Sequence, residues 1–415
     1  MTERSKYWKI LAASCLLVAT VVDLSIDDTL LRSSADLSAS LQEWGGQGLK
    51  IFGLLFSFMF AFVPYGFVYF SFLTSRKQLR TLHYSSVFFL SVTIGVLLKV
   101  IFYKGRPWAI NDKVTGSSCD PGLPSGHAIM SVTGYYIMHK MLIVANYPNN
   151  KLAQKISAAV CSVIVFLVCV SRITLGDHGY NQLIIGALVA WTCIEILDYK
   201  CFIWFLKHTK GTLKLIMAGL TLASLGLLIL FCYIDHEHRE NYAFWTNISN
   251  DKVDCKSTFT IGAAQSGPIY AWAFGTLMFY SFRSDRIESV APLGQNRVGI
   301  RVFIHFVSLL PVLIFMSGAG MIIADIEDTV SLCVAWAISM TVVFLYAAIA
   351  MVYISRLLRE KLKLNGREDY IFWSQIEAEH TKLAKPARPS QSDEPLQSPT
   401  DDSRERPSLE NPNKI

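Results

Sequence analysis

The chain has 415 residues, of which 52% are hydrophobic and only 17% are charged, and its mean hydropathy is +0.37. Soluble domains carry about 25% charged residues, so this composition excludes a conventional soluble globule, and its 25 Phe, 17 Tyr and 9 Trp exclude a disordered chain. The net charge of +6 comes from short basic clusters between apolar runs rather than from one basic face, which indicates membrane topology and argues against nucleic-acid binding.

Ten apolar runs are long enough to span a bilayer, since a spanning helix needs about 20 mostly apolar residues. In chain order they are residues 8–24, 49–73, 84–102, 127–146, 154–172, 180–199, 213–234, 266–282, 300–324 and 329–355. The fourth run is the least apolar, because it contains His127, His139 and Lys140, and it is included because its loss would invert every later run. The sequence therefore predicts an all-α fold, a polytopic membrane helix bundle of about ten spans.

Basic residues in the short connections predict the orientation of these runs. The connection after every even-numbered run contains Lys or Arg, whereas the connections after the seventh and ninth runs contain acidic stretches. Because basic connections stay on the cytosolic side, both termini are expected in the cytosol. The first run has an alternative reading as a cleaved signal sequence.

Asn247 begins an Asn-Ile-Ser triplet in the non-cytosolic connection after the seventh run. This triplet is an acceptor pattern for N-glycosylation, and its position agrees with the predicted orientation. An unused triplet is the alternative.

Three sets of polar residues lie at the ends of apolar runs, where ionisable groups are costly and are therefore candidates for function. The sets are Lys99 with Arg106, then Ser125-Gly126-His127, then Arg172 with His178. The parity of the crossings brings all three to the same, non-cytosolic membrane surface. Any one of these residues alone would be more typical of an interfacial anchor or of a helix-start histidine. Their order and their shared side predict a single site.

The residue types in these sets fit phosphoryl transfer. Lys99, Arg106 and Arg172 supply positive donors, and Arg guanidinium groups match phosphoryl oxygens bidentately. The Ser125-Gly126 turn before a helix offers an anion backbone N–H groups and the positive end of the helix dipole. Since three cations can supply the stabilisation that Mg²⁺ gives elsewhere, neither a metal nor another cofactor is expected.

The two histidines, His127 and His178, can divide the chemistry. One imidazole, unprotonated, attacks phosphorus and forms a phosphohistidine, while the other, protonated, donates to the leaving alkoxide. Gln182 lies four residues after His178, so the two share a helix face. Its side-chain oxygen is expected to accept the Nδ1 proton of His178 and to leave Nε2 free for attack.

The three sets resemble the signature of the type 2 phosphatidic acid phosphatase superfamily, which reads Lys-x6-Arg-Pro, Pro-Ser-Gly-His and Ser-Arg-x5-His-x3-Asp. The first two parts match in full, whereas Gln182 stands at the final Asp of the third. Glucose-6-phosphatases also carry Gln there, and the segment 119–128 with the Tyr135-Tyr136 pair is similar to theirs as well. The resemblance runs from about residue 35 to 355 and implies a helical core like that of the haloperoxidases.

This resemblance implies a role for each site residue. His178 is the nucleophile, His127 is the general acid, and Lys99, Arg106 and Arg172 are phosphate ligands. It also implies an endoplasmic reticulum membrane enzyme whose luminal site releases phosphate from glucose 6-phosphate. Because this metabolite is cytosolic, a sugar phosphate transporter is an expected partner, besides the membrane lipids.

The chain departs from that family at both ends. The resembling family has nine spans and a luminal N-terminus, so residues 8–24 would be an extra span, and the tail lacks a two-lysine retrieval signal. Trp108 follows the first motif and is a candidate for stacking on a sugar ring, with an interfacial aromatic residue as the alternative.

The predicted division of the chain has three parts. Residues 1–7 form a cytosolic N-terminus, and residues 8–356 form a membrane phosphatase domain with a catalytic core at about 49–200 and additional spans over 213–355. Residues 357–415 form a largely disordered cytosolic tail rich in Pro and Ser. Two other functions stay open, namely a phosphatase for a phosphorylated lipid and a non-catalytic transporter or sensor that keeps an anion site.

Overall fold

A computed structural model describes residues 3–57, 63–64, 67, 78–116 and 121–209, together with isolated positions at 226, 331, 335, 338, 378–381 and 383. Throughout these residues the regular elements are helices, which confirms the predicted all-helical class for this part of the chain. The predicted spans over 213–355, the triplet at Asn247 and the tail after 356 lie outside the described residues, apart from those isolated positions.

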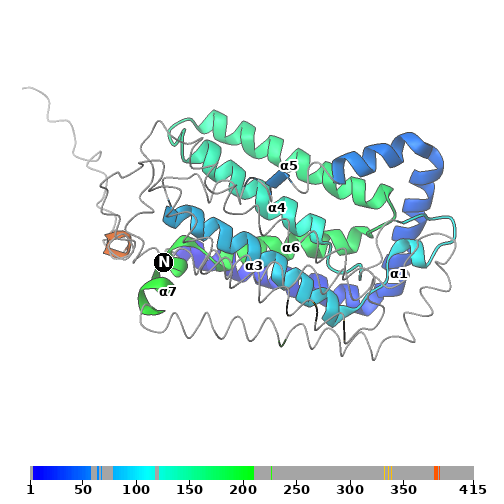
Figure 1. Ribbon diagram of the computed structural model, residues 1–415, viewed down its shortest axis with the longest axis horizontal. Helices are drawn as coiled ribbons and strands as arrows, with labels where there is room; N and C mark the ends of the chain where they lie inside the picture. The colour runs from blue at the N-terminus through cyan, green and yellow to red at the C-terminus, as the bar shows by residue number, and fades with distance from the viewer. Residues whose placement is uncertain are drawn as a thin grey trace, which may run out of the picture.

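Six α-helices make up the described fold. They are α1 (Glu3–Leu55), α3 (Gln78–Phe102), α4 (Gly126–Met138), α5 (Lys151–Thr174), α6 (Tyr180–Ile196) and α7 (Tyr199–Thr209). The helices α3, α4, α5 and α6 run side by side, and α4 continues as a π-helix over His139–Val144 (Figure 1). Phe88, Phe89, Ile129, Ile137 and Ile185 are buried between them and form the centre of the core.

Two described helices are long and apolar enough to cross a membrane, namely Tyr7–Ile26 and Lys151–Thr174. A third crossing results if α6 and α7, which meet at a bend of 58°, form one broken span. The chain is therefore a membrane protein, while the predicted count of about ten spans is not confirmed. The predicted runs 84–102, 154–172 and 180–199 coincide with α3, α5 and α6 within a few residues.

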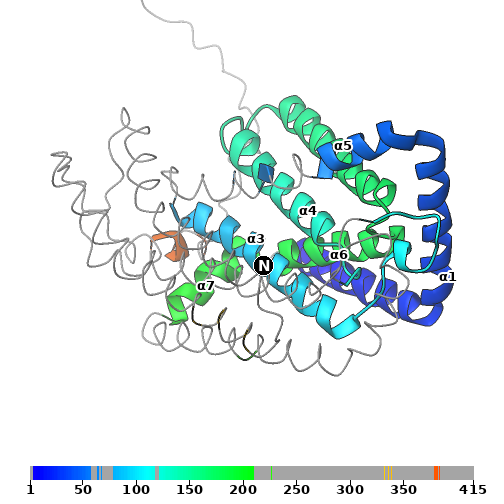
Figure 2. The same cartoon turned by 45° about the vertical axis from the view of Figure 1, so that its right-hand side comes forward.

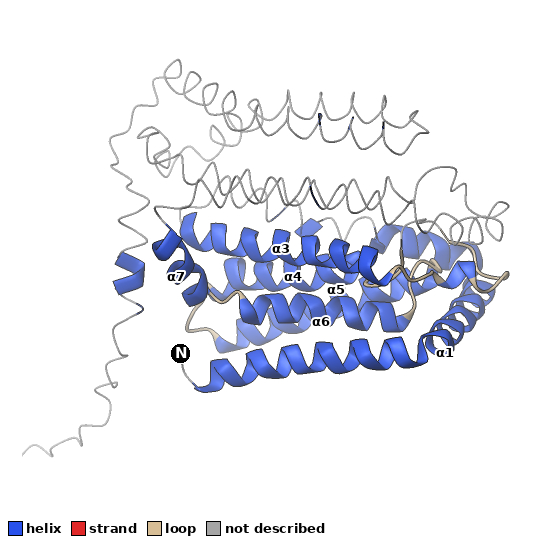
Figure 3. Cartoon of the chain, turned by 90° about the horizontal axis from the view of Figure 1, so that it is seen from below, coloured by secondary structure: helices blue, strands red, loops and turns tan. Residues whose placement is uncertain are grey.

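Helix α1 bends twice and wraps around one end of the bundle. Its backbone leaves helical geometry at Ile26 (φ −130°, ψ 25°) and at Gly46 (φ 49°, ψ −140°), where the positive φ suits glycine. The first limb lies along α6, the second crosses the end of the bundle, and the third turns back beside α5 (Figures 2 and 3). The connection between the first two predicted spans, residues 25–48, is thus helical, although its sequence predicts no helix there.

The second limb of α1 is bonded to the connections that it crosses. The Nε2 atom of Gln42 donates to the carbonyl oxygens of Thr115 (2.9 Å) and Thr174 (3.0 Å). The backbone N–H of Thr115 donates in return to Oε1 of Gln42 at 2.9 Å. The α3–α4 and α5–α6 connections, in and beside which the three motif sets lie, therefore meet at this end of the bundle.

The first limb of α1 is bonded to α6 at one end and to the α6–α7 bend at the other. At the start of α6, Asn181 donates to the buried Asp23 at 2.6 Å, and in the bend after α6, Asp198 forms an ion pair with Lys9 at 2.7 Å. The segment read from the sequence as an extra span is therefore an integral part of the described core.

Candidate functional site

The beginning of α4 is built by Ser125 and Gly126. Ser125 is the N-cap, and its side chain accepts from the backbone N–H of Ala128 at 3.4 Å. The N–H of Ser125 donates to the carbonyl oxygen of Gln182 at 3.0 Å, which ties α4 to α6. A Cβ atom at Gly126 would meet no atom of another segment within 4 Å, so there is open space beside this residue. This turn can present backbone N–H groups to an anion.

The turn after α5 places two site residues. The N–H groups of Asp177 and His178 both donate to the carbonyl oxygen of Arg172, at 3.1 and 3.3 Å. Gly176 has a φ of +69° in this turn, and a Cβ there would lie 2.5 Å from the carbonyl oxygen of Thr115. A side chain at position 176 would therefore clash with the neighbouring connection.

His178 is almost completely buried, and its hydrogen bonds fix its tautomer. Its Nδ1 atom lies 2.9 Å from the carbonyl oxygen of Gly122 and 3.3 Å from Oε1 of Gln182. A carbonyl oxygen only accepts, so Nδ1 carries the proton and Nε2 keeps a lone pair. The expected contact with Gln182 is present, but the carbonyl group of Gly122 is the nearer acceptor.

Gln182 also joins the α3–α4 connection to the α5–α6 connection. Its Oε1 accepts from the N–H of Gly179 at 3.2 Å, and its Nε2 donates to the carbonyl oxygen of Gly105 at 2.7 Å. A carboxylate could not donate to Gly105. The departure from the Asp of the superfamily signature thus has a physical reason, because the amide accepts on one side and donates on the other. Gly122 is close to this group, since its Cβ would lie 2.5 Å from Nε2 of Gln182.

Three buried cations surround His178. The guanidinium of Arg106 donates to the carbonyl oxygen of Asp177, and its Nη1 lies 3.3 Å from Nε2 of His178. Lys99, in the last turn of α3, and Arg172, in the last turn of α5, are buried as well. His178 stands in the connection between α5 and α6, where burial lowers its pKa well below the usual value of 6.5 and the nearby cations, Arg106 first among them, lower it further. The imidazole is therefore neutral at physiological pH.

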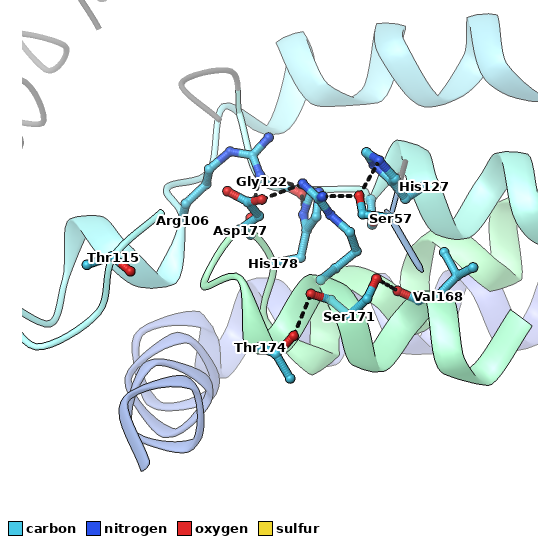
Figure 4. A network of polar contacts seen from close by, with 12 residues as sticks. Ser57, Arg106, Thr115, Gly122, His127, Val168, Ser171, Thr174, Asp177 and His178 are labelled. Carbon is cyan, nitrogen blue, oxygen red and sulfur yellow. Dashed lines mark hydrogen bonds and ion pairs between the residues drawn. The ribbon is translucent and has the colours of Figure 1, made fainter. Parts of the chain in front are cut away.

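Arg172 links a carboxylate to the second histidine. Its Nη2 pairs with Oδ2 of Asp177 at 2.6 Å, and its Nη1 donates to the hydroxyl of Ser57. The same hydroxyl lies 3.1 Å from Nε2 of His127 (Figure 4). A continuous chain of polar contacts thus runs from Asp177 through Arg172 and Ser57 to His127.

Trp108 lies at the edge of this arrangement. It is buried in a small cluster with Ala109 and Val114, and Ala39 of α1 packs against the cluster. Its predicted contact with a sugar ring stays a prediction.

Three groups of the site were missed by the sequence analysis. Gly122 acts through its backbone oxygen, which leaves no trace in residue types, and Ser57 lies far from the motifs on an apolar run that contains one other serine, Ser71. Asp177 had a signal, since it is a charged residue directly before His178. Among the described residues, no group of three or more His, Cys, Asp or Glu side chains is placed to hold a metal ion.

Comparison with known proteins gives one match. Residues 80–207 match the family model of the PAP2 superfamily. This segment contains nearly all of α3, the whole of α4, α5 and α6, and most of α7. With them it contains both histidines, the three cations and Gln182, whereas Ser57 and the whole of α1 lie outside it. No match was found among curated proteins or among solved structures.

Proposed function

We propose that this chain is a membrane phosphohydrolase in which His178 attacks the phosphorus of a phosphate monoester. The observation that carries this proposal is the environment of His178. Its Nδ1 proton is held by the carbonyl group of Gly122, its Nε2 lone pair faces the guanidinium of Arg106, and its pKa is low. The match of residues 80–207 to the PAP2 superfamily supports a phosphatase.

The reaction has two halves. In the first, Nε2 of His178 forms a bond to phosphorus while the bond from phosphorus to the ester oxygen breaks, and His127 gives its proton to that oxygen. In the second, His127 takes a proton from water as the water oxygen attacks the phosphohistidine. The bond from nitrogen to phosphorus then breaks, and inorganic phosphate and neutral His178 result.

The cations stabilise the charge that develops on the phosphoryl oxygens. Arg106 lies next to the attacking nitrogen, and Arg172 is held by its ion pair with Asp177. These groups are buried and fixed before the reaction, so their attraction for the phosphoryl group is weakly screened and needs little reorganisation. Lys99 and the backbone N–H groups of the first turn of α4 complete the proposed phosphate site.

The proposed substrate is glucose 6-phosphate, delivered to the luminal side of the endoplasmic reticulum membrane by a sugar phosphate transporter, with both termini in the cytosol. Gln182 supports this choice, because the glucose-6-phosphatases that the sequence resembles also carry Gln there. The amide oxygen of Gln182 accepts from the N–H of Gly179, and its amide nitrogen donates to the carbonyl oxygen of Gly105.

The test is phosphate release by the purified protein from glucose 6-phosphate, mannose 6-phosphate and a phosphorylated lipid. We expect the first substrate to be preferred and His178→Ala to be inactive. His139→Ala is the matched control, since His139 lies at the far end of α4 and contacts Ser157. Rapid quenching under alkaline conditions, where phosphohistidine survives, should trap a covalent phosphoenzyme in the wild type and in His139→Ala but not in His178→Ala.

The same assay separates the alternatives. Full activity of His178→Ala would remove the proposed nucleophile, preference for the lipid would favour a lipid phosphatase, and phosphate binding without turnover would favour a transporter or sensor. Full hydrolysis of glucose 6-phosphate by intact microsomes that lack sugar phosphate transport would contradict the luminal site.

A further inference from the structure

The hydroxyl group of Ser57 lies between a proposed phosphate ligand and the proposed general acid. Ser57 follows the third limb of α1 and is buried. Its Oγ accepts from Nη1 of Arg172 and lies 3.1 Å from Nε2 of His127 (Figure 4). It belongs to none of the three motif sets and precedes the segment that matches the PAP2 superfamily.

A hydroxyl group can bond to His127 in either protonation state. Ser57 has one proton and two lone pairs, and Arg172, which can only donate, uses one lone pair. Nε2 of His127 donates its proton to the second lone pair, so the proton for the ester oxygen comes from Nδ1 of the doubly protonated imidazole. After that transfer Nε2 still carries its own proton and stays hydrogen-bonded to Ser57. The contact with Ser57 therefore leaves Nδ1 as the nitrogen that serves the substrate, both before and after proton transfer.

The hydrogen bond from Arg172 fixes the position of the Ser57 hydroxyl, and with it the orientation of the His127 ring. The ester oxygen that receives the proton is attached to the same phosphorus whose other oxygens Arg172 would bind. The acid and the phosphate ligand must therefore keep a fixed separation during the reaction. The Ser57 oxygen, which is hydrogen-bonded to both Arg172 and His127, provides this fixed separation. Asp177 holds Arg172 from the other side through an ion pair of 2.6 Å.

We propose that Ser57 is a positioning residue for His127, which it ties to Arg172 so that proton transfer is directed at the ester oxygen of bound substrate. This inference rests on the proposed function. It adds to the site a residue that directly follows α1, so that the N-terminal region contributes to the reaction as well as to packing.

The test compares two substrates that differ in their need for an acid. Alkyl phosphates such as glucose 6-phosphate leave as strongly basic alkoxides, whereas p-nitrophenyl phosphate leaves as a stable phenolate and needs little protonation. For Ser57→Ala we expect kcat with the alkyl phosphate to fall by roughly 10- to 100-fold, because loss of a general acid costs about 10²- to 10⁴-fold. With p-nitrophenyl phosphate, the kcat of Ser57→Ala should fall by less than about threefold. Ser57→Thr keeps the hydroxyl and should retain most of the activity on both substrates.

Ser38→Ala is the matched control, since Ser38 is equally buried in α1 and its hydroxyl donates to the carbonyl oxygen of Ser34. Equal losses of Ser57→Ala on both substrates, or no loss on either, would overturn the positioning role. If Ser57→Ala does not fold, Ser57→Cys must show the same selective loss. A wild-type protein that hydrolyses neither substrate would refute the proposed function itself, and this outcome is distinct from equal losses in an active enzyme.

Discussion

Replacement of Asp177 by Asn tests whether the buried ion pair after α5 holds Arg172 in place. The exposed fractions of the two side chains are 0% for Asp177 and 4% for Arg172, so solvent screens the pair very little. Removal of one partner from such a pair costs roughly 3–5 kcal/mol. The Asn oxygen can still accept a hydrogen bond from Arg172, which returns about 0.5–1.5 kcal/mol. We therefore expect the free energy of unfolding to fall by about 2–4 kcal/mol.

The substitution leaves the other contact of this residue intact, because Arg106 donates to the backbone oxygen of Asp177. Inorganic phosphate can replace the lost negative charge, so it should bind to the Asn variant more tightly than to the wild type. Tenfold tighter binding would give about 1.4 kcal/mol of additional stabilisation at saturating phosphate.

The assay is unfolding of the detergent-solubilised protein with and without inorganic phosphate. The control is Asp36→Asn, in which an exposed carboxylate bonded to Asn111 is changed in the same way, and its effect should stay within about 0.5 kcal/mol. If the Asp177 variant unfolds like the wild type, or if phosphate stabilises both equally, the ion pair does not hold Arg172 and the reasoning is wrong.

Three further predictions follow from the contacts of the site. Because the pKa of His178 is low, its imidazole stays unprotonated in the folded protein, whereas the unfolded chain takes up a proton there below pH 6.5. The free energy of unfolding should therefore decline as the pH falls below 6.5. His178→Asn should remove this part of the pH dependence. Gln182→Glu places a carboxylate oxygen against the carbonyl oxygen of Gly105 in place of a donor at 2.7 Å, which should lower kcat/KM by about 5- to 150-fold; an unchanged kcat/KM would show that this bond is dispensable. Asp23→Leu leaves the buried amide of Asn181 without this acceptor and should cost about 1–3 kcal/mol in thermal unfolding, whereas an unchanged melting temperature would mean that α1 does not brace α6 there.

The sequence predicted those features that depend on residue type and spacing. The apolar runs located α3, α5 and α6 because a buried or lipid-facing helix needs a continuous apolar stretch. Ser125 could be identified as an N-cap, because a Ser followed by Gly before an apolar run is a local signal. The meeting of the three motif sets followed from parity alone, since helices that cross a layer alternately must return to the same face.

Other features depend on tertiary contacts that carry no local signal. The connection at residues 25–48 is helical because its second limb is held by the α3–α4 and α5–α6 connections through Gln42, a partner set that only the folded chain provides. The Gly122 carbonyl group competes with Gln182 for the Nδ1 proton of His178, and every residue has such a carbonyl group. Ser57 depends on a pairing across 115 positions with Arg172, for which one sequence contains no evidence.

The hydrogen bond between Asp23 and Asn181 has a consequence for how the protein is made. The two residues are 158 positions apart, and the earlier one lies inside Tyr7–Ile26, one of the helices suited to cross a membrane. At about 5–20 residues per second, a ribosome needs roughly 8–30 s to reach the second residue after the first. The carboxylate of Asp23 must therefore stay near the translocation machinery or the lipid headgroups until Asn181 has been synthesised. The first limb of α1 can pack in its final position only after α6 has emerged, so this packing is a late event of biosynthesis.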